Sequence, residues 1–97
     1  MKELTTENFK SWIKRKKKAV VLFWWDYCKP CKAIEKELEK LPQNTNIGII
    51  DVNKQLELTQ KYRVIKLPCL ILFNYGKEAD RIIGYHSVTE IKQWLNL

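Results

Sequence analysis

Two cysteines separated by a lysine and a proline are the residues of this sequence best placed to do chemistry. Cys28 and Cys31 lie three residues apart, where an apolar segment ends and a helical pattern begins. On the first turn of a helix, this spacing brings the two sulfur atoms close enough to bridge. The free N–H groups and the dipole of that turn favour an anion, so the Cys28 thiol should ionise more easily than an ordinary cysteine. The pair therefore indicates thiol–disulfide exchange, in which Cys28 attacks a substrate disulfide and Cys31 resolves the mixed disulfide.

The two residues between the cysteines favour the same chemistry. Pro30 suits the first turn of a helix, because the N–H that it lacks would be unpaired there in any case. Lys29 adds a positive charge beside Cys28 and stabilises its thiolate. A stabilised thiolate favours the reduced form, so the disulfide should be somewhat more oxidising.

A zinc site is the alternative interpretation of the cysteine pair. Two cysteines at this spacing are half of a zinc site, and Cys69 with His86 could supply the remaining ligands. Zinc-binding pairs usually lie on polar, glycine-rich knuckles, whereas this pair opens a helix after an apolar segment. We therefore expect no metal, with Cys69 as a small buried core residue and His86 on the surface.

Hydrophobic patterning predicts the strands that must position the cysteines. Residues 19–25 form a continuous apolar run, which is typical of a strand buried on both faces. Residues 47–52 and 69–73 are two further strands. A hairpin turn over residues 74–77 leads back to a fourth strand, Arg81 to Tyr85.

Four helices are predicted around these strands. The first is capped by Thr5 or Thr6, the second is ended by Pro42, the third covers residues 54–62, and a capping box of Ser87 and Glu90 opens the fourth. Apolar stripes identify their buried faces, with Phe9, Trp12 and Ile13 on the first, Ala33, Ile34, Leu38 and Leu41 on the second, Leu58 and Tyr62 on the third, and Ile91, Trp94 and Leu95 on the fourth. The order αβαβαββα predicts an α/β fold in which helices cover both faces of a mixed four-stranded sheet. Any N-terminal strand is short or absent, since little chain precedes the first helix.

Length and charge limit the other classes of function. The 97 residues allow a single domain, residues 1–97. The net charge of +7 comes mostly from one run, Lys14 to Lys18, which we interpret as a solvated helix end. No aromatic residue interleaves with it, so a nucleic-acid partner is not expected.

No apolar stretch approaches the ~20 residues of a membrane span, and the cysteine usage fits a cytoplasmic protein with reduced thiols.

Beyond the cysteine pair, the chain resembles the thioredoxin family along almost its whole length. The resemblance rests on short motifs in the family's order: Leu4-Thr5 and Phe9, Phe23-Trp24, Cys28 to Lys32, Asp51-Val52-Asn53 through Lys61-Tyr62, Leu67-Pro68, Tyr75-Gly76-Lys77 and Gly84.

The resemblance implies a thioredoxin fold and a substrate groove around the cysteines. Pro68 would be the family's cis-proline, and the backbone of Leu67 would meet an extended substrate strand. Gly84 would keep the groove open, and Trp24 and Tyr27 would flank the thiols. The resemblance also implies protein-disulfide reduction with no cofactor beyond the redox-active disulfide. Its partners would be disulfide-containing proteins and a thioredoxin reductase that supplies electrons, and the protein would be a monomer.

Two departures from the family pattern lie in the predicted core. Leu22 stands where many thioredoxins have a buried acid that helps to ionise the second cysteine, and Ile49 stands where they have a buried lysine. Losing two buried charges should stabilise the fold, but Cys31 must then lose its proton without a nearby carboxylate. Two other functions stay open beside the reductase: a thioredoxin-fold binding module that docks through its basic face, and a more oxidising disulfide oxidase or isomerase.

Overall fold

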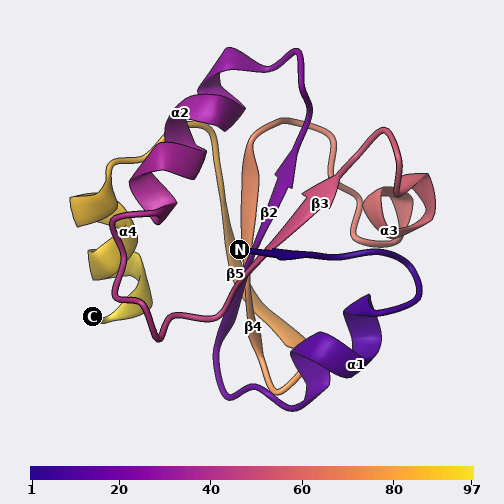
Figure 1. Cartoon of the computed structure of the whole chain (residues 1–97), viewed down its shortest axis with the longest axis horizontal. Helices are drawn as coiled ribbons and strands as arrows, with labels where there is room; N and C mark the ends of the chain where they lie inside the picture. The colour runs from indigo at the N-terminus through magenta and orange to yellow at the C-terminus, as the bar shows by residue number, and fades with distance from the viewer.

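A five-stranded sheet lies between two pairs of helices in the computed structural model, which describes all 97 residues (Figure 1). The elements in chain order are β1 (Lys2–Glu3), α1 (Phe9–Lys14), β2 (Ala19–Trp24), α2 (Lys29–Leu38), β3 (Ile47–Asp51), α3 (Leu56–Lys61), β4 (Cys69–Asn74), β5 (Lys77–Ile83) and α4 (Val88–Leu95). No helix is long and apolar enough to cross a membrane.

The strand that leads to the cysteines is the centre of the sheet. The strand order is β1-β3-β2-β4-β5, so β2 has a hydrogen-bonded neighbour on each side. It pairs parallel with β3 and antiparallel with β4. All its residues except Trp24 are buried, as the continuous apolar run predicts for a strand covered on both faces. The carboxyl end of β2, where the cysteines follow, is therefore held on both sides.

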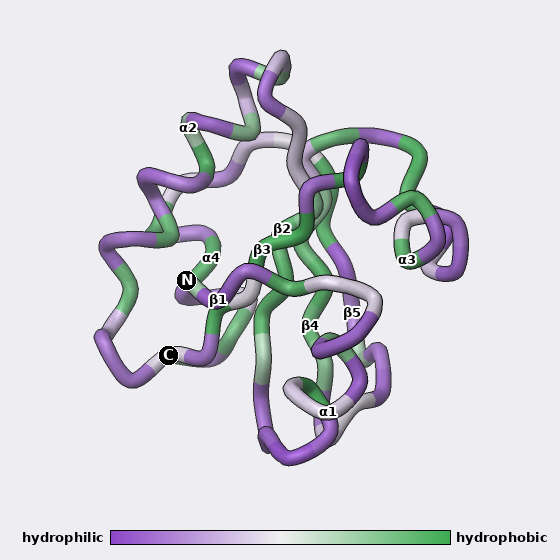
Figure 2. Tube along the Cα trace, turned by 45° about the vertical axis from the view of Figure 1, so that its right-hand side comes forward, coloured by the Kyte–Doolittle hydropathy of each residue, from purple (hydrophilic) through white to green (hydrophobic).

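Each face of the sheet carries its own apolar core. α1 and α3 cover one face with Phe9, Ile13 and Leu58, and α2 and α4 cover the other with residues such as Ile34 and Ile91. Figure 2 shows the hydrophobic residues concentrated along the central strands, while the helices alternate between hydrophobic and hydrophilic. This alternation is the amphipathic pattern from which the helices were predicted.

The predicted α/β fold is confirmed, and the short N-terminal strand is present, which raises the number of strands from the predicted four to five. The sheet has five strands, because the two residues of β1 pair parallel with Gly48 and Ile49 of β3. The last strand also begins four residues earlier than predicted, at Lys77. Strands this short or this exposed carry no apolar alternation, so the sequence pattern does not mark them.

The ends of the helices show smaller differences. The capping box of Ser87 and Glu90 is confirmed in both of its hydrogen bonds. The prediction that Thr5 or Thr6 caps the first helix is wrong. The N-cap of α1 is Asn8, and its side chain makes no capping hydrogen bond. The Thr5 hydroxyl instead accepts from the N–H groups of Glu7 and Asn8 in the preceding turn.

A β-bulge interrupts the pairing of β4 with β5. Phe73 pairs with Glu78 but Leu72 pairs with Asp80, which leaves Ala79 as an extra residue in β5. Beyond the bulge, Arg81 pairs with Ile71 and faces the α1 and α3 side of the sheet. Without the extra residue it would pair with Leu70 and face the opposite side.

Candidate active site

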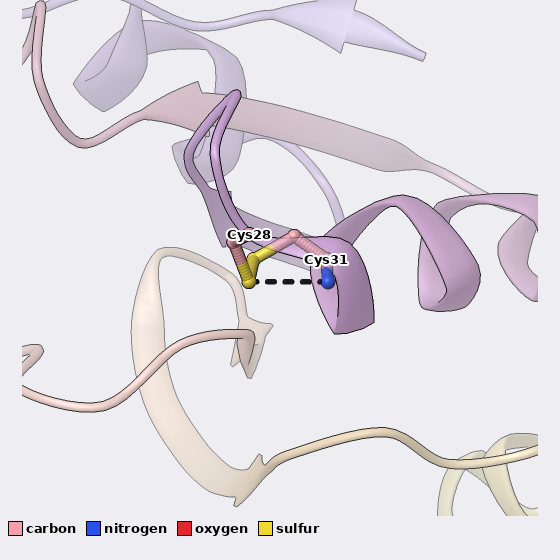
Figure 3. The surroundings of a disulfide bond; sticks show 2 residues. All are labelled: Cys28 and Cys31. Carbon is pink, nitrogen blue, oxygen red and sulfur yellow. Dashed lines mark hydrogen bonds between the residues drawn. A yellow bond between two sulfur atoms is a disulfide. The ribbon is translucent and has the colours of Figure 1, made fainter.

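The two cysteines are joined by a disulfide at the beginning of α2 (Figure 3). Their Cα atoms are 5.2 Å apart, within the range that a disulfide requires. Cys28 is the N-cap residue with extended backbone, and its Sγ accepts a hydrogen bond from the N–H of Cys31 at 3.2 Å. A sulfur at this position lies against the positive end of the helix dipole, where a thiolate is stabilised.

The two sulfurs of the pair differ in access to solvent. Cys31 is 1% exposed and belongs to the buried face of α2, whereas Cys28 is partly exposed. Lys29 and Pro30 lie between them on the first turn of the helix, and both are exposed. Of the two sulfur atoms, that of Cys28 is therefore the more accessible from solvent.

Aromatic side chains lie directly before the cysteines. Trp24 is half-buried against the core under α2, and Tyr27 is 82% exposed. Tyr27 contacts Trp25 edge to face, with the ring centroids 5.0 Å apart. The strand predicted over residues 19–25 is one residue too long, because β2 ends at Trp24 and Trp25 is 40% exposed. The sequence does carry a signal that the buried strand ends here, because the polar residue Asp26 follows Trp25 directly.

Leu67, Pro68 and Gly84 come together at the beginning of β4 and the end of β5. The Leu67–Pro68 peptide bond is cis. The Pro68 carbonyl accepts a hydrogen bond of 2.8 Å from the N–H of Gly84. Gly84 has a φ of +89°, which favours glycine, and a Cβ placed on it would meet no atom within 4 Å. The surface above Gly84 is therefore open.

The third cysteine and the histidine do not join the pair. Cys69 is 1% exposed in the core beside Phe23, as predicted, and burial raises the pKa of its thiol. His86 lies near the surface, where its Nε2 is 3.2 Å from the Ile83 carbonyl. No group of three or more histidine, cysteine or carboxylate side chains is placed to hold a metal ion.

The core near the cysteine pair is entirely apolar. Leu22 is fully buried beneath α2 and pairs with Ile49 across β2 and β3. The molecule has no buried polar or charged side chain. Consequently, no buried carboxylate is available to take a proton from Cys31.

Comparisons with known proteins agree with this geometry. The family model described as Thioredoxin matches residues 1–97. The chain belongs to the thioredoxin family. Its cysteine pair forms a disulfide at the family's CXXC site, and the chain is accordingly a thiol–disulfide oxidoreductase of the protein-disulfide reductase type.

Thioredoxins from distant organisms share both sequence and fold with this chain. Thioredoxin of Buchnera aphidicola is 32% identical over 100 residues, which cover 98% of this chain and 92% of that protein. Mitochondrial thioredoxin-2 of Schizosaccharomyces pombe is 41% identical over 80 residues, which cover 79% of this chain and 60% of that protein. A point variant of Halobacterium salinarum thioredoxin has the same fold, with a TM-score of 0.91, 22% identity and coverage of 98% and 87% of the two chains.

Proposed function

We propose that Cys28 is the nucleophile and Cys31 the resolving thiol in the reduction of protein disulfides. The observation that carries this assignment is the difference in exposure, with Cys28 partly exposed and Cys31 almost completely buried. The position of the Cys28 sulfur at the N-terminus of α2 supports it further, because a thiolate is the attacking form.

The reaction passes two electrons from the protein dithiol to the substrate. The Cys28 thiolate attacks one sulfur of the substrate disulfide, so a Cys28–substrate bond forms while the substrate S–S bond breaks. The first substrate sulfur leaves as a thiolate and takes a proton. Cys31 then loses its proton and attacks the Cys28 sulfur, which forms the Cys28–Cys31 disulfide and releases the second substrate thiolate.

The substrate approaches over the surface formed by the residues around Cys28. The backbone of Leu67, beside Pro68, meets the substrate strand, and Gly84 leaves room for it. Trp24 and Tyr27 flank the attacked disulfide, and Lys29 with Pro30 shapes the first turn of α2. The open space above Gly84 and the exposure of Tyr27 support this arrangement.

The reaction needs no cofactor other than the redox-active disulfide. A thioredoxin reductase returns two electrons to it after each turnover. The protein works as a monomer in the cytoplasm, and residues 1–97 act as one domain. Disulfide-containing proteins are the substrates, as the family implies.

Reduction of insulin disulfides tests the roles of the two cysteines. The wild-type chain with a dithiol reductant should reduce insulin, and Cys28→Ser should abolish the catalysed rate. Cys31→Ser should instead accumulate a mixed disulfide between Cys28 and the substrate, visible by mass spectrometry. Mixed disulfides on Cys31 in the Cys28→Ser variant, at the rate of the wild type, would reverse the assignment.

The direction of electron flow is tested by the equilibrium of the pair with glutathione. If the protein is a reductase, the Cys28–Cys31 disulfide should stay oxidised in glutathione and should be reduced only by a strong dithiol reductant. A pair that glutathione alone reduces fully would favour the oxidase or isomerase.

A further inference from the structure

A small cavity with positively charged walls lies beside the Leu67–Pro68 segment. Its volume is about 250 Å³, and its lining includes Arg63, Lys66 and Arg81, with Cys69 at the first residue of β4. Three apolar side chains complete it. They are Val64, which is half-buried, and Ile65 and Ile83, which are 88% and 50% exposed. The cavity is too small for most organic ligands but has room for one amino-acid side chain.

The cavity directly adjoins the residues assigned above to the substrate surface. Lys66 precedes Leu67 and Pro68 in the chain, and Ile83 precedes Gly84. Cys69 and Ile83 are direct partners across β4 and β5, and the Pro68 carbonyl is bonded to the N–H of Gly84. A substrate strand lying over Leu67 and Gly84 would therefore pass the mouth of the cavity.

One cation of the cavity is held in place by the fold. The Arg81 Nε donates to Glu78 at 2.7 Å, and its Nη2 donates to Glu78 and to the Tyr62 carbonyl, each at 2.8 Å. These contacts leave Nη1 without an oxygen partner. A fixed guanidinium loses little side-chain entropy when it binds a carboxylate, which makes it a better anion ligand than a free surface lysine.

The charge of the cavity remains positive after this pairing. Glu78 neutralises one of the three cations, and no carboxylate lines the cavity. Arg63 and Lys66 are exposed and form no ion pair within the chain. On the other face of β5, Asp80 binds the Trp94 indole and does not offset them. A ligand with an anionic group beside an apolar one would therefore complement both the cations of the cavity and its two exposed isoleucines, Ile65 and Ile83.

We propose that this cavity selects disulfide substrates that carry an acidic side chain close to the attacked cysteine. The carboxylate binds Lys66, Arg63 and Nη1 of Arg81, while an adjacent apolar residue contacts Ile65 or Ile83. The inference rests on the proposed function, since it assumes that substrates lie over Leu67 and Gly84. It adds a substrate class to that function and names the residues that recognise it.

Matched peptide disulfides test this selection. Two peptides identical except for Glu or Gln at the positions flanking the cysteine are reduced by the prereduced protein, and stopped-flow tryptophan fluorescence gives the second-order rate constants. The acidic peptide should react roughly two- to five-fold faster, as expected for a partly exposed carboxylate–cation contact. Added salt should shrink this ratio toward 1.

Substitutions then locate the source of the preference. The ratio of acidic to neutral rates should fall toward 1 in the double variant Arg63→Asn with Lys66→Gln, where Asn tolerates the left-handed backbone of residue 63. Lys92→Gln, which removes an exposed cation from α4, is the matched control and should keep the ratio of the wild type.

The outcomes separate this inference from the function on which it rests. If the wild-type protein reduced the acidic and the neutral peptide at equal rates, the selection alone would be overturned. A preference that survives the double variant but is lost in Lys29→Gln would also overturn it, because the charge beside Cys28 would then be the source of the preference. Failure to reduce any of the peptides would contradict the proposed function itself, and the selection with it.

Discussion

At the scale of single residues, the burial of Leu22 leads to the clearest prediction about the chemistry. It is buried under α2 in a core without any charged group, so Cys31 must lose its proton to water or to a departing thiolate. We expect release of the second substrate thiol to be slow at neutral pH and to accelerate as pH rises. The same apolar core should stabilise the fold, since it avoids the burial of a charge.

Leu22→Asp tests this trade between stability and rate. The variant should be less stable by roughly 3 kcal/mol, because an unpaired carboxyl is buried. It should nevertheless resolve the mixed disulfide faster at pH 7 and with a weaker dependence on pH. Urea denaturation and stopped-flow decay of the mixed disulfide measure the two effects. Leu22→Asn is the matched control, and an equal acceleration in that variant would exclude proton transfer as the cause.

Residue types and spacing were sufficient to identify the reactive pair and much of its setting. The cysteine pair, the buried Cys69 and the capping box at Ser87 follow from local chemistry, which sequence records directly. The predicted strand over residues 19–25 includes the exposed Trp25, because the residue at which a strand ends depends on tertiary pairing. A run of apolar letters shows that a strand exists but not at which residue it leaves the core.

At the scale of elements, the contact between α2 and α4 depends on a carboxylate. Glu37 of α2 accepts a hydrogen bond from Lys40 at 2.7 Å and another from the N–H of Val88 at 2.9 Å. These bonds, that of Lys40 foremost, hold the pKa of Glu37 below its ordinary value of 4.5. A lowered pKa in the folded state means that this stabilisation is complete above pH 4.5. It is lost as the pH falls through the lowered pKa.

Glu37→Gln should therefore destabilise the protein at neutral pH but not in acid. The amide can still accept from Val88, but the ion pair with Lys40 is gone. The difference in urea midpoint between variant and wild type should be clear at pH 7 and should shrink as the pH falls below 4.5 and the wild-type carboxyl takes up its proton. Glu39→Gln, on the exposed C-cap of the same helix, should show no such difference. A difference in midpoint that does not shrink in acid would contradict the role of the charge.

The cavity beside Cys69 shows why part of the site cannot be predicted from sequence. Arg81 reaches it only because the bulge in β5 shifts the register by one residue. If residues are counted forward from the turn at Tyr75 and Gly76 with strict alternation, Arg81 falls on the opposite face of the sheet, under α4. Of the residues that line the cavity, only Cys69 was singled out from the sequence, and it was predicted as a core residue.

At the scale of the whole molecule, the basic run and the disulfide lie at opposite ends of β2. Six residues of strand separate them by roughly 17–20 Å. This exceeds the ~8–10 Å over which surface charges act at physiological salt. Two of the lysines also have structural contacts, since Lys16 lies over the Trp12 ring and Lys18 donates to the Leu95 carbonyl.

Removing the other charges of the run should therefore leave the chemistry unchanged. The triple variant Lys14→Gln, Arg15→Gln, Lys17→Gln should reduce insulin disulfides at a rate within about two-fold of the wild type. A loss of ten-fold or more, with the fold intact by circular dichroism, would show that the basic face takes part in turnover. It would favour the binding-module interpretation.

The bulge at Ala79 has a consequence for the behaviour of the protein at high concentration. β5 is the long free edge of the sheet, and an unprotected edge can recruit a strand from another molecule and begin aggregation. The extra residue breaks the regular spacing of its outward N–H and C=O groups. A second copy pairing antiparallel about Ala79 would also set Lys77 against Arg81 and Glu78 against Asp80. Like charges would repel at both positions, so the irregularity that turns Arg81 toward the cavity also keeps the edge from templating fibrils.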